Sequence, residues 1–288
     1  MTHIEPCSIK INLNLRVFGR KPNGYHELHT LFWRRPSPEV LTVRFAEGEK
    51  SPDKLSVYGA AIPGENLVMR VIEGLRTQDV IAHAFPPLDI ALYKFLPMGS
   101  GVGAGSGNAA AIFKWAQRMG VSLDVKNSAD YGADVAFLAG SAGLAYAEGV
   151  GEELTAVNEE LELPGMIVFP KWFSSTGRAY SLLDDFRKTA GGETTLAEAR
   201  AESRDLLKKL LKGEKAGLLP NDFLPILSSR HLEYEAFFND AESLGALAWG
   251  LCGSGSALFV LFAGREPLFS LQRFLTGAEW IEKIWVLG

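Results

Sequence analysis

The sequence predicts an α+β protein built from two domains. Its 288 residues suffice for two domains of ordinary size, and 47% hydrophobic with 22% charged residues is typical of a folded globular chain. Alternating, strand-like segments open the chain, whereas the part that follows "ELELPGMIVFP" has a β-α-β-β-α-β pattern with extra helices. We therefore expect a boundary near residues 155–160, which gives domains at 1–157 and 158–288.

Composition argues against several classes of protein. A net charge of −5 does not suit a general nucleic-acid binder, which needs basic surface against phosphates. Cys7 and Cys252 are far apart, so we expect neither a disulfide framework nor a cysteine metal site, and a reducing cytoplasm is indicated. The first residues lack the pattern of a secretory signal. Uncharged stretches at 95–113 and 245–264 are broken by glycine and serine, so no membrane span is expected.

The segment "IKINLNLRV" (9–17) alternates apolar and polar residues. This predicts a half-buried strand whose polar face carries Lys10, Asn12, Asn14 and Arg16. An exposed strand lysine is ordinarily just solvated, so Lys10 alone does not indicate a site.

A turn region, "GRKPNGYHEL", follows the first strand and places Tyr25 and His26 directly after it. An aromatic ring and an imidazole there could hold a flat ligand ring. The alternative is a core tyrosine beside a surface histidine.

Two further segments have helical spacing. "PGENLVMRVIEGLR" (63–76) repeats apolar residues at i, i+4. "TTLAEARAESRDLLKKLLKG" (194–213) offers Thr194 or Thr195 as N-cap and ends at Gly213.

The stretch "PMGSGVGAGSGNAAA" (97–111) has a glycine at every second position from 99 to 107. It connects the strand "LDIALYKFLP" to an amphipathic helix that ends at Gly120, with Ser106 or Asn108 as the expected N-cap. A helix start favours anions, and missing Cβ atoms let backbone N–H groups approach phosphate closely. The stretch matches neither a Walker loop nor a dinucleotide fingerprint. A phosphate-binding loop and a plain glycine-rich connection both remain open.

Two other positions are ambiguous on local evidence. Asp134 in "GADV" precedes an apolar run, where an acidic residue is most often a helix cap. "CGSGSA" (252–257) is a second glycine turn between two strands, for which a plain hairpin is the alternative.

Together, however, the motifs point to one family. They are, in order, "KINLNLRVFGRKPNGYHELHTLF", "PGENLV", "LPMGSGVGAGSGNAAA", "GADVAFLAGSAGLAYAEGVGEEL", "STGRAYSLLD", "NDF" and "GSGSALF". Over nearly its whole length the chain resembles the 4-diphosphocytidyl-2-C-methyl-D-erythritol kinases of the GHMP kinase superfamily. The Lys-Ile-Asn and Gly-Tyr-His-Glu-Leu block is the most specific part of this resemblance.

The resemblance implies a fold and a reaction. The fold would be a two-domain GHMP kinase, with an N-terminal ribosomal-protein-S5-like α/β domain that binds ATP and a C-terminal ferredoxin-like βαββαβ domain that binds substrate. The reaction would move the γ-phosphate of ATP, with Mg²⁺, to the 2-hydroxyl of 4-diphosphocytidyl-2-C-methyl-D-erythritol in the non-mevalonate isoprenoid pathway. The implied partner is this small molecule, with no nucleic acid or membrane. A cytoplasmic monomer or weak homodimer is expected.

The resemblance also implies roles for individual residues. Asp134 would act as general base and Lys10 would keep it ionised, with no protein residue assigned as metal ligand. The ATP phosphates would lie on a glycine loop formed by Pro97, Gly99, Gly101, Gly103, Gly105, Ser106 and Asn108.

The substrate would be bound by a second group of residues. His26 would read the cytosine edge, and the ring would stack between Tyr25 and a second aromatic residue, Tyr180 or alternatively Phe186. Asn12 would bind the methylerythritol or its diphosphate. The turn with Gly253 and Gly255 would close near the substrate phosphates.

The chain departs from the family pattern at several loop positions. Ser100, Val102, Ala104 and Gly107 stand where glycine, leucine, glycine and serine are usual, and Cys252 replaces a serine. Loss of a hydroxyl at Gly107 is expected to weaken nucleotide binding. Another GHMP kinase, or a non-catalytic nucleotide-binding relative, remains the alternative.

Overall fold

The computed structural model describes residues 2–22, 24–47, 52–60, 62, 64–78, 80–81, 85–123, 125–190 and 194–287. The chain forms two compact units. Unit 1 comprises Met1–Lys10, Arg34–Leu96 and Gly103–Ser141, and unit 2 comprises Ile11–Trp33, Pro97–Val102 and Ala142–Gly288. The first two strands therefore contribute to both units, and the expected boundary at 157/158 stays a prediction.

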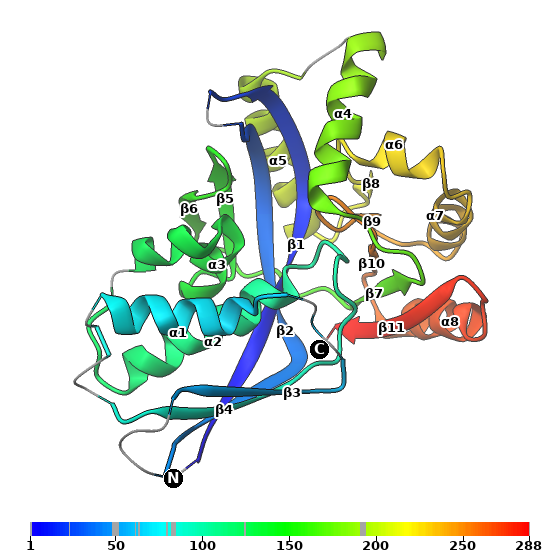
Figure 1. The fold of residues 1–288 in the computed structure, drawn as a ribbon. Coiled ribbons are helices and arrows are strands. Elements are labelled where there is room, and N and C mark those ends of the chain that lie inside the picture. The colour runs from blue at the N-terminus through cyan, green and yellow to red at the C-terminus, as the bar shows by residue number, and fades with distance from the viewer. Residues whose placement is uncertain are drawn as a thin grey trace. The chain divides into compact units, whose positions relative to one another are not determined.

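Unit 1 combines a small sheet with three helices and a 3₁₀ segment. Its strands are the first part of β1 (Thr2–Arg20), the second part of β2 (His26–Phe45), β3 (Lys54–Tyr58) and β4 (Leu88–Tyr93). β4 runs antiparallel to β2 and parallel to β3. The helical elements are α1 (Leu67–Thr77), α2 (Ala104–Arg118), η1 (Val125–Tyr131) and α3 (Ala133–Ala139). α1 and α2 pack against each other, as Figure 1 shows.

Unit 2 contains the remaining part of the first sheet and a separate five-stranded sheet. β5 (Leu144–Glu148) pairs with β2 and with β6 (Glu153–Val157). The five-stranded sheet has the order β11-β7-β10-β9-β8. Its strands are β7 (Gly165–Pro170), β8 (Gly217–Leu218), β9 (Ala248–Leu251), β10 (Leu258–Leu261) and β11 (Ile281–Leu287).

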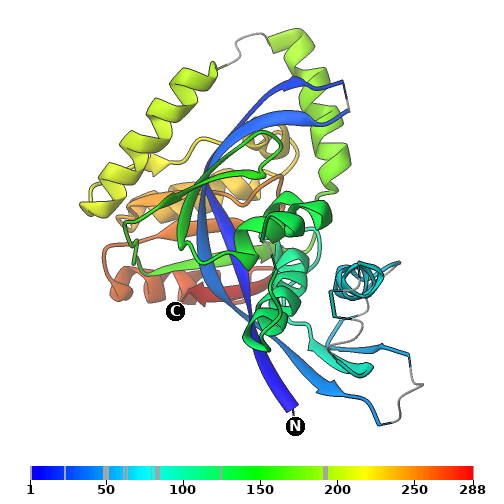
Figure 2. The ribbon, with the colours of Figure 1, turned by 90° about the vertical axis from the view of Figure 1, so that its left-hand side faces the viewer.

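The helices of unit 2 complete its hydrophobic core. They are α4 (Thr176–Ala190), α5 (Leu196–Leu211), α6 (Leu224–Ser228), α7 (Glu233–Ser243) and α8 (Arg265–Leu275). Apolar side chains of α7 and α8 join those of β7, β9 and β10 in one buried cluster, and both helices lie against this sheet in Figure 1 and Figure 2. The order β11-β7-β10-β9, with helices in the two crossovers, confirms the predicted ferredoxin-like βαββαβ pattern.

The predicted first strand is present, but its polar face is not solvated. Lys10, Asn12 and Asn14 are all buried, so the expectation of a half-buried strand is wrong. Partners within the protein replace water, because a buried polar group needs a hydrogen bond. Asn12 Nδ2 donates to Thr30 Oγ1 at 2.9 Å, and Arg16 donates to the carboxylate of Asp222 at 2.8 Å.

Side chains cap two of the helices predicted from the sequence, and the Thr195 cap was expected. Asn66 caps α1 by accepting a hydrogen bond from Val68 N, and Thr195 forms a capping box with Glu198 at the start of α5. The start of α2 differs, because Gly103 is its N-cap and Ser106 and Asn108 already lie in its first turns. Gly103 has a left-handed φ of 67°, which a glycine adopts without strain. The helix therefore begins earlier in the sequence than expected.

The two uncharged stretches have separate places in the fold. Residues 95–113 cover the glycine loop and the first part of α2, and residues 245–264 form the β9–β10 hairpin. Within the described ranges, no helix combines the length and the apolar composition that crossing a membrane requires.

Candidate active site

The two predicted catalytic residues lie together in unit 1. Lys10 belongs to β1, and Asp134 lies in the first turn of α3. Lys10 Nζ is 3.6 Å from Asp134 Oδ2, with side-chain exposures of 7% and 30%. The two opposite charges attract each other at this distance, and the Asp134 side chain is partly exposed.

Gly103 brings the start of α2 against this pair. A Cβ atom at Gly103 would lie 3.0 Å from Asp134 Oδ2 and 3.4 Å from Lys10 Cε, so only glycine leaves this space open. No side chain caps the 15-residue helix α2. Its first N–H groups, which lack intrahelical acceptors, therefore form an anion-attracting end beside a Lys–Asp pair.

Gly105 and Ser106 follow in the first turn of α2, whereas Asn108 has a different role. The Asn108 side chain is buried; its Nδ2 donates to Glu39 Oε2 at 2.7 Å and its Oδ1 accepts from Lys94 Nζ at 3.2 Å. These contacts occupy both ends of the amide. Asn108 thus positions the helix, and its side chain is directed at the protein interior.

Glu39 is the centre of this buried network, and the sequence reasoning missed it. Its carboxylate, fully buried in β2, lies 2.7 Å from Lys94 Nζ. Its Oε1 also accepts from the backbone N–H groups of Phe95 and Leu96 at 3.1 and 2.9 Å. Glu39 therefore binds the chain just before the glycine loop and, through Asn108, the helix that follows it.

The unusual Gly107 has a steric cause. A Cβ atom at Gly107 would lie 1.7 Å from the carbonyl oxygen of Ser8, because α2 packs directly on β1 at this point. A serine here would need a backbone shift, so the missing hydroxyl reflects close packing between α2 and β1.

The first half of the glycine loop, Pro97–Val102, packs within unit 2 on the turn between β9 and β10. Gly99 and Gly101 have φ angles of 64° and 82°. A Cβ atom at Gly101 would lie 1.9 Å from the carbonyl oxygen of Cys252, and Gly99 O accepts from Ser256 N at 3.3 Å. The predicted glycine turn between two strands is confirmed, since β9 and β10 pair antiparallel across it and Gly253 and Gly255 have φ angles of 53° and 87°.

His26 forms the centre of a second cluster in unit 2. It is 8% exposed, so the alternative of a surface histidine is wrong. Its Nε2 lies 2.7 Å from Asp184 Oδ1, and its ring stacks on Tyr180 with centroids 4.9 Å apart. Tyr25 is 65% exposed, and Phe186 is also exposed. Tyr180 therefore covers a face of His26, whereas Tyr25 and Phe186 offer accessible rings.

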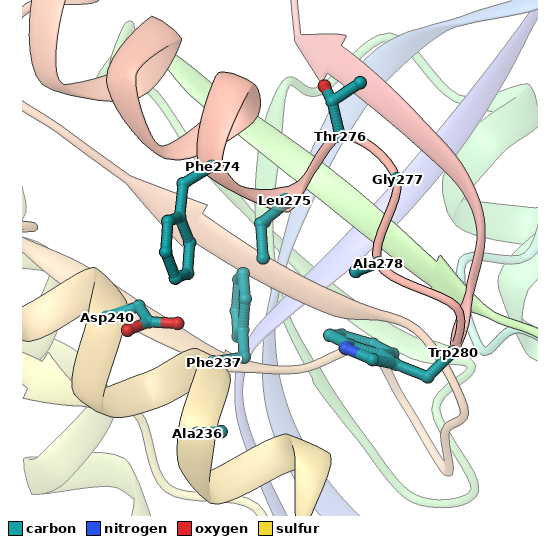
Figure 3. Close-up of a pocket in the computed structure, with 9 residues that line it drawn as sticks. All are labelled: Ala236, Phe237, Asp240, Phe274, Leu275, Thr276, Gly277, Ala278 and Trp280. Atoms are coloured by element: carbon teal, nitrogen blue, oxygen red, sulfur yellow. The ribbon is translucent and has the colours of Figure 1, made fainter.

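A further pocket lies elsewhere in unit 2. It has a volume of about 460 Å³, and Figure 3 shows that its lining residues come from α7, the end of α8 and the segment that leads into β11. A smaller polar pocket of about 210 Å³ lies beside His29 and Arg200. None of the candidate residues is among the described residues that line either pocket.

The described residues contain no cluster of three or more His, Cys, Asp or Glu side chains arranged to bind a metal ion. Mg²⁺ prefers oxygen ligands and is commonly held by one or two protein oxygens together with phosphates. The Asp134 carboxylate and the Ser106 hydroxyl of unit 1 are oxygen donors of this kind. The chemistry of these two groups suits Mg²⁺ that arrives with a nucleotide.

Comparison with known families gives two matches in chain order. Residues 66–148 match the GHMP kinases N terminal domain, and residues 195–281 match the GHMP kinases C terminal domain. The first match covers α1, the glycine loop and Asp134. Such kinases are small-molecule phosphotransferases that use ATP.

Curated relatives resemble the chain over most of its length. A 4-diphosphocytidyl-2-C-methyl-D-erythritol kinase of Porphyromonas gingivalis is 33% identical over 270 residues, which are 90% of this chain and 92% of the relative. One of Chlorobaculum tepidum is 29% identical and covers 91% of this chain and 89% of its own length.

Solved structures agree with these relatives. A crystal structure of 4-(cytidine 5'-diphospho)-2C-methyl-D-erythritol kinase superposes with a TM-score of 0.76 at 26% identity, covering 100% of this chain and 98% of that one. The homoserine kinase from Cytophaga hutchinsonii, at 18% identity, has a TM-score of 0.68, covers 100% and 94%, and shows the fold alone. On this combined evidence the chain is a kinase and belongs to the 4-diphosphocytidyl-2-C-methyl-D-erythritol kinase family of GHMP kinases.

Proposed function

We propose that this kinase transfers the γ-phosphate of ATP to the 2-hydroxyl of 4-diphosphocytidyl-2-C-methyl-D-erythritol in the non-mevalonate pathway. One observation carries the phosphotransfer part of the proposal. The uncapped start of α2 meets Lys10 and Asp134 at Gly103. Phosphoryl transfer depends mainly on positioning and charge compensation, and this arrangement supplies both.

Asp134 orients the acceptor hydroxyl and takes its proton, because a carboxylate within reach of the hydroxyl can serve as general base. Lys10, at 3.6 Å from Asp134, offsets negative charge at the acceptor oxygen. N–H groups of Gly103, Gly105 and Ser106 bind phosphate oxygens. ATP supplies the phosphoryl group, and Mg²⁺, with Asp134 and Ser106 as donors, supplies positive charge. Pro97, Gly99 and Gly101 stay predictions as phosphate contacts.

The substrate's base is recognised by the cluster around His26. His26 is buried and held by two side chains, while Tyr25 is an accessible ring suited to stack on cytosine. Tyr180, which stacks on His26, and Phe186, which is exposed, remain the two candidates for the opposite face of the cytosine. Asn12, Gly253 and Gly255 remain the proposed contacts for the rest of the substrate.

The proposal includes a cellular setting. The enzyme acts on a small molecule in the cytoplasm, without nucleic acid or membrane, as a monomer or weak homodimer. The low cysteine content and the negative net charge support this setting. Sedimentation velocity over a range of concentrations tests the oligomeric state.

Phosphorylation assays test the function directly. The purified protein is given ATP and Mg²⁺ with the cytidine-linked substrate, with mevalonate and with homoserine. We expect turnover of the cytidine substrate alone, and His26→Ala is expected to raise its KM with little effect on kcat. Preferred turnover of mevalonate or homoserine would contradict the proposal. ATP binding with no turnover of any alcohol would favour a non-catalytic relative.

A further inference from the structure

Helix α4 holds the His26 ring with two side chains that lie one turn apart. Tyr180 stacks on the ring at an interplanar angle of 25°, and Asp184, four residues later, binds Nε2 at 2.7 Å. Residues at i and i+4 share a helix face, so both contacts come from a single surface. Tyr180 therefore fixes one face of the His26 imidazole, and Asp184 fixes its Nε2.

The contact with Asp184 determines which nitrogen carries the proton. An ionised carboxylate only accepts hydrogen bonds, so the Nε2 that faces it must be the protonated nitrogen. In the neutral ring the other nitrogen, Nδ1, then carries a lone pair and accepts. No described residue forms a hydrogen bond with Nδ1. Nδ1 of His26 is therefore an oriented hydrogen-bond acceptor to which a ligand can donate.

This acceptor distinguishes two pyrimidines. Cytosine has an amino group at C4, which donates, whereas uracil has a carbonyl oxygen there, which accepts. An Nδ1 lone pair pairs with the amino group and is repelled by the carbonyl oxygen. A ring with the opposite tautomer would prefer uracil at the same position.

We propose that Asp184 is the residue that makes the base site specific for cytosine, by fixing His26 in the Nε2–H tautomer. This inference rests on the proposed function, since it assumes that the His26 cluster receives the base. Asp184 acts through His26 and is thus a positioning residue.

Binding of CDP and UDP tests the proposal, because the two nucleotides differ only in the base. Calorimetric titrations compare the wild type with Asp184→Ala and Asp185→Ala. Asp185 is the matched control, since it neighbours Asp184 but forms an exposed ion pair with Lys188. We expect the wild type and Asp185→Ala to prefer CDP by about tenfold or more, the ratio that one discriminating hydrogen bond supplies. Asp184→Ala is expected to lose most of that ratio, chiefly through weaker CDP binding.

The tautomer itself can be observed. Long-range ¹H–¹⁵N spectra are expected to show His26 as the Nε2–H form in the wild type and Asp185→Ala, and as a mixture of tautomers in Asp184→Ala. Kinetics with the cytidine substrate should show a higher KM and a nearly unchanged kcat for Asp184→Ala. A merely structural role would lower both kcat and stability. Asp184→Leu, which keeps side-chain bulk, provides a second removal of the carboxylate, and circular dichroism confirms that each variant is folded.

The outcomes separate the two levels of the proposal. Equal affinity of the wild type for CDP and UDP would contradict the proposed base recognition itself. A wild-type preference that persists in both Asp184→Ala and Asp184→Leu, with an unchanged His26 tautomer, would overturn only the role of Asp184.

Discussion

The ammonium of Lys10 and the carboxylate of Asp134 form an ion pair at the uncapped start of α2, with Gly103 as their common neighbour. Replacing Asp134 with asparagine keeps the shape but removes the base. We expect Asp134→Asn to lower kcat by about 100-fold or more, while the KM for ATP stays within a few-fold. Steady-state kinetics give both values. Asp130→Asn, an exposed position in the preceding η1 segment, is the control and should behave as the wild type. Normal turnover by Asp134→Asn would refute the mechanism.

Restoring the family's serine at position 107 should harm the protein. The new Cβ would lie 1.7 Å from Ser8 O, and relief of that overlap must move α2 or β1. We expect Gly107→Ser to lower the free energy of unfolding by about 1–3 kcal/mol. Gly105→Ser is the matched control in the same helical turn, where an added Cβ meets nothing within 4 Å. Its effect should stay within about 0.5 kcal/mol. Urea unfolding measures the free energy of unfolding of both variants. A Gly107→Ser variant more stable than the wild type would contradict the steric explanation.

Removing the charge of Glu39 should be costly. Glu39→Gln would leave the Lys94 ammonium buried without its counter-ion, so we expect a loss of about 3–5 kcal/mol in the free energy of unfolding. Asp89→Asn breaks an ion pair with the exposed Arg44 in the same sheet and should cost less than about 1 kcal/mol. Chemical denaturation measures the free energy of unfolding of both variants. A similarly small loss in Glu39→Gln and Asp89→Asn would show that the buried network contributes little to stability.

Mild acid should destabilise the protein through His29. Its Nδ1 lies 3.1 Å from Glu148 and its Nε2 lies 2.8 Å from Ser203 Oγ, yet burial lowers the pKa of His29 below 6.5. The unfolded chain therefore takes up this proton at a higher pH than the folded chain does. The free energy of unfolding is expected to fall as the pH drops below about 6.5. Burial also lowers the pKa of His231, so His29→Gln should reduce this slope without abolishing it. Urea unfolding at several pH values measures the slope, and an unchanged slope in the variant would exclude His29.

Features that depend on local sequence were predictable. The alternation in β1, the Thr195 capping box and the hairpin between β9 and β10 each depend on neighbouring residues. The βαββαβ order of unit 2 was predictable from the sequence, because short connections limit how strands and helices can be arranged. Lys10 and Asp134 were paired by family resemblance, and the structure does bring them together.

Features that depend on distant residues were not predictable in this way. Glu39 stands in "SPEVLTV" with no local sign that Lys94 and Asn108 would surround it. The burial of the polar face of β1 likewise required knowledge of what packs there. The i+4 spacing of Tyr180 and Asp184 is a local sign that they share a helix face, but it does not show that His26 lies against that face.

The division of the chain between the two units has a consequence for protein synthesis. Every segment of unit 1 lies within the first 141 residues, so this unit can fold while translation continues. Unit 2 needs Ile11–Trp33 together with the segment after Ala142. The residues between Ile11 and Trp33 must therefore leave the ribosome early and remain without their partner segment until the rest of the chain has emerged. During that interval Ile11, Leu13 and Leu15, which are buried in the folded protein, lack the segment after Ala142 that completes unit 2.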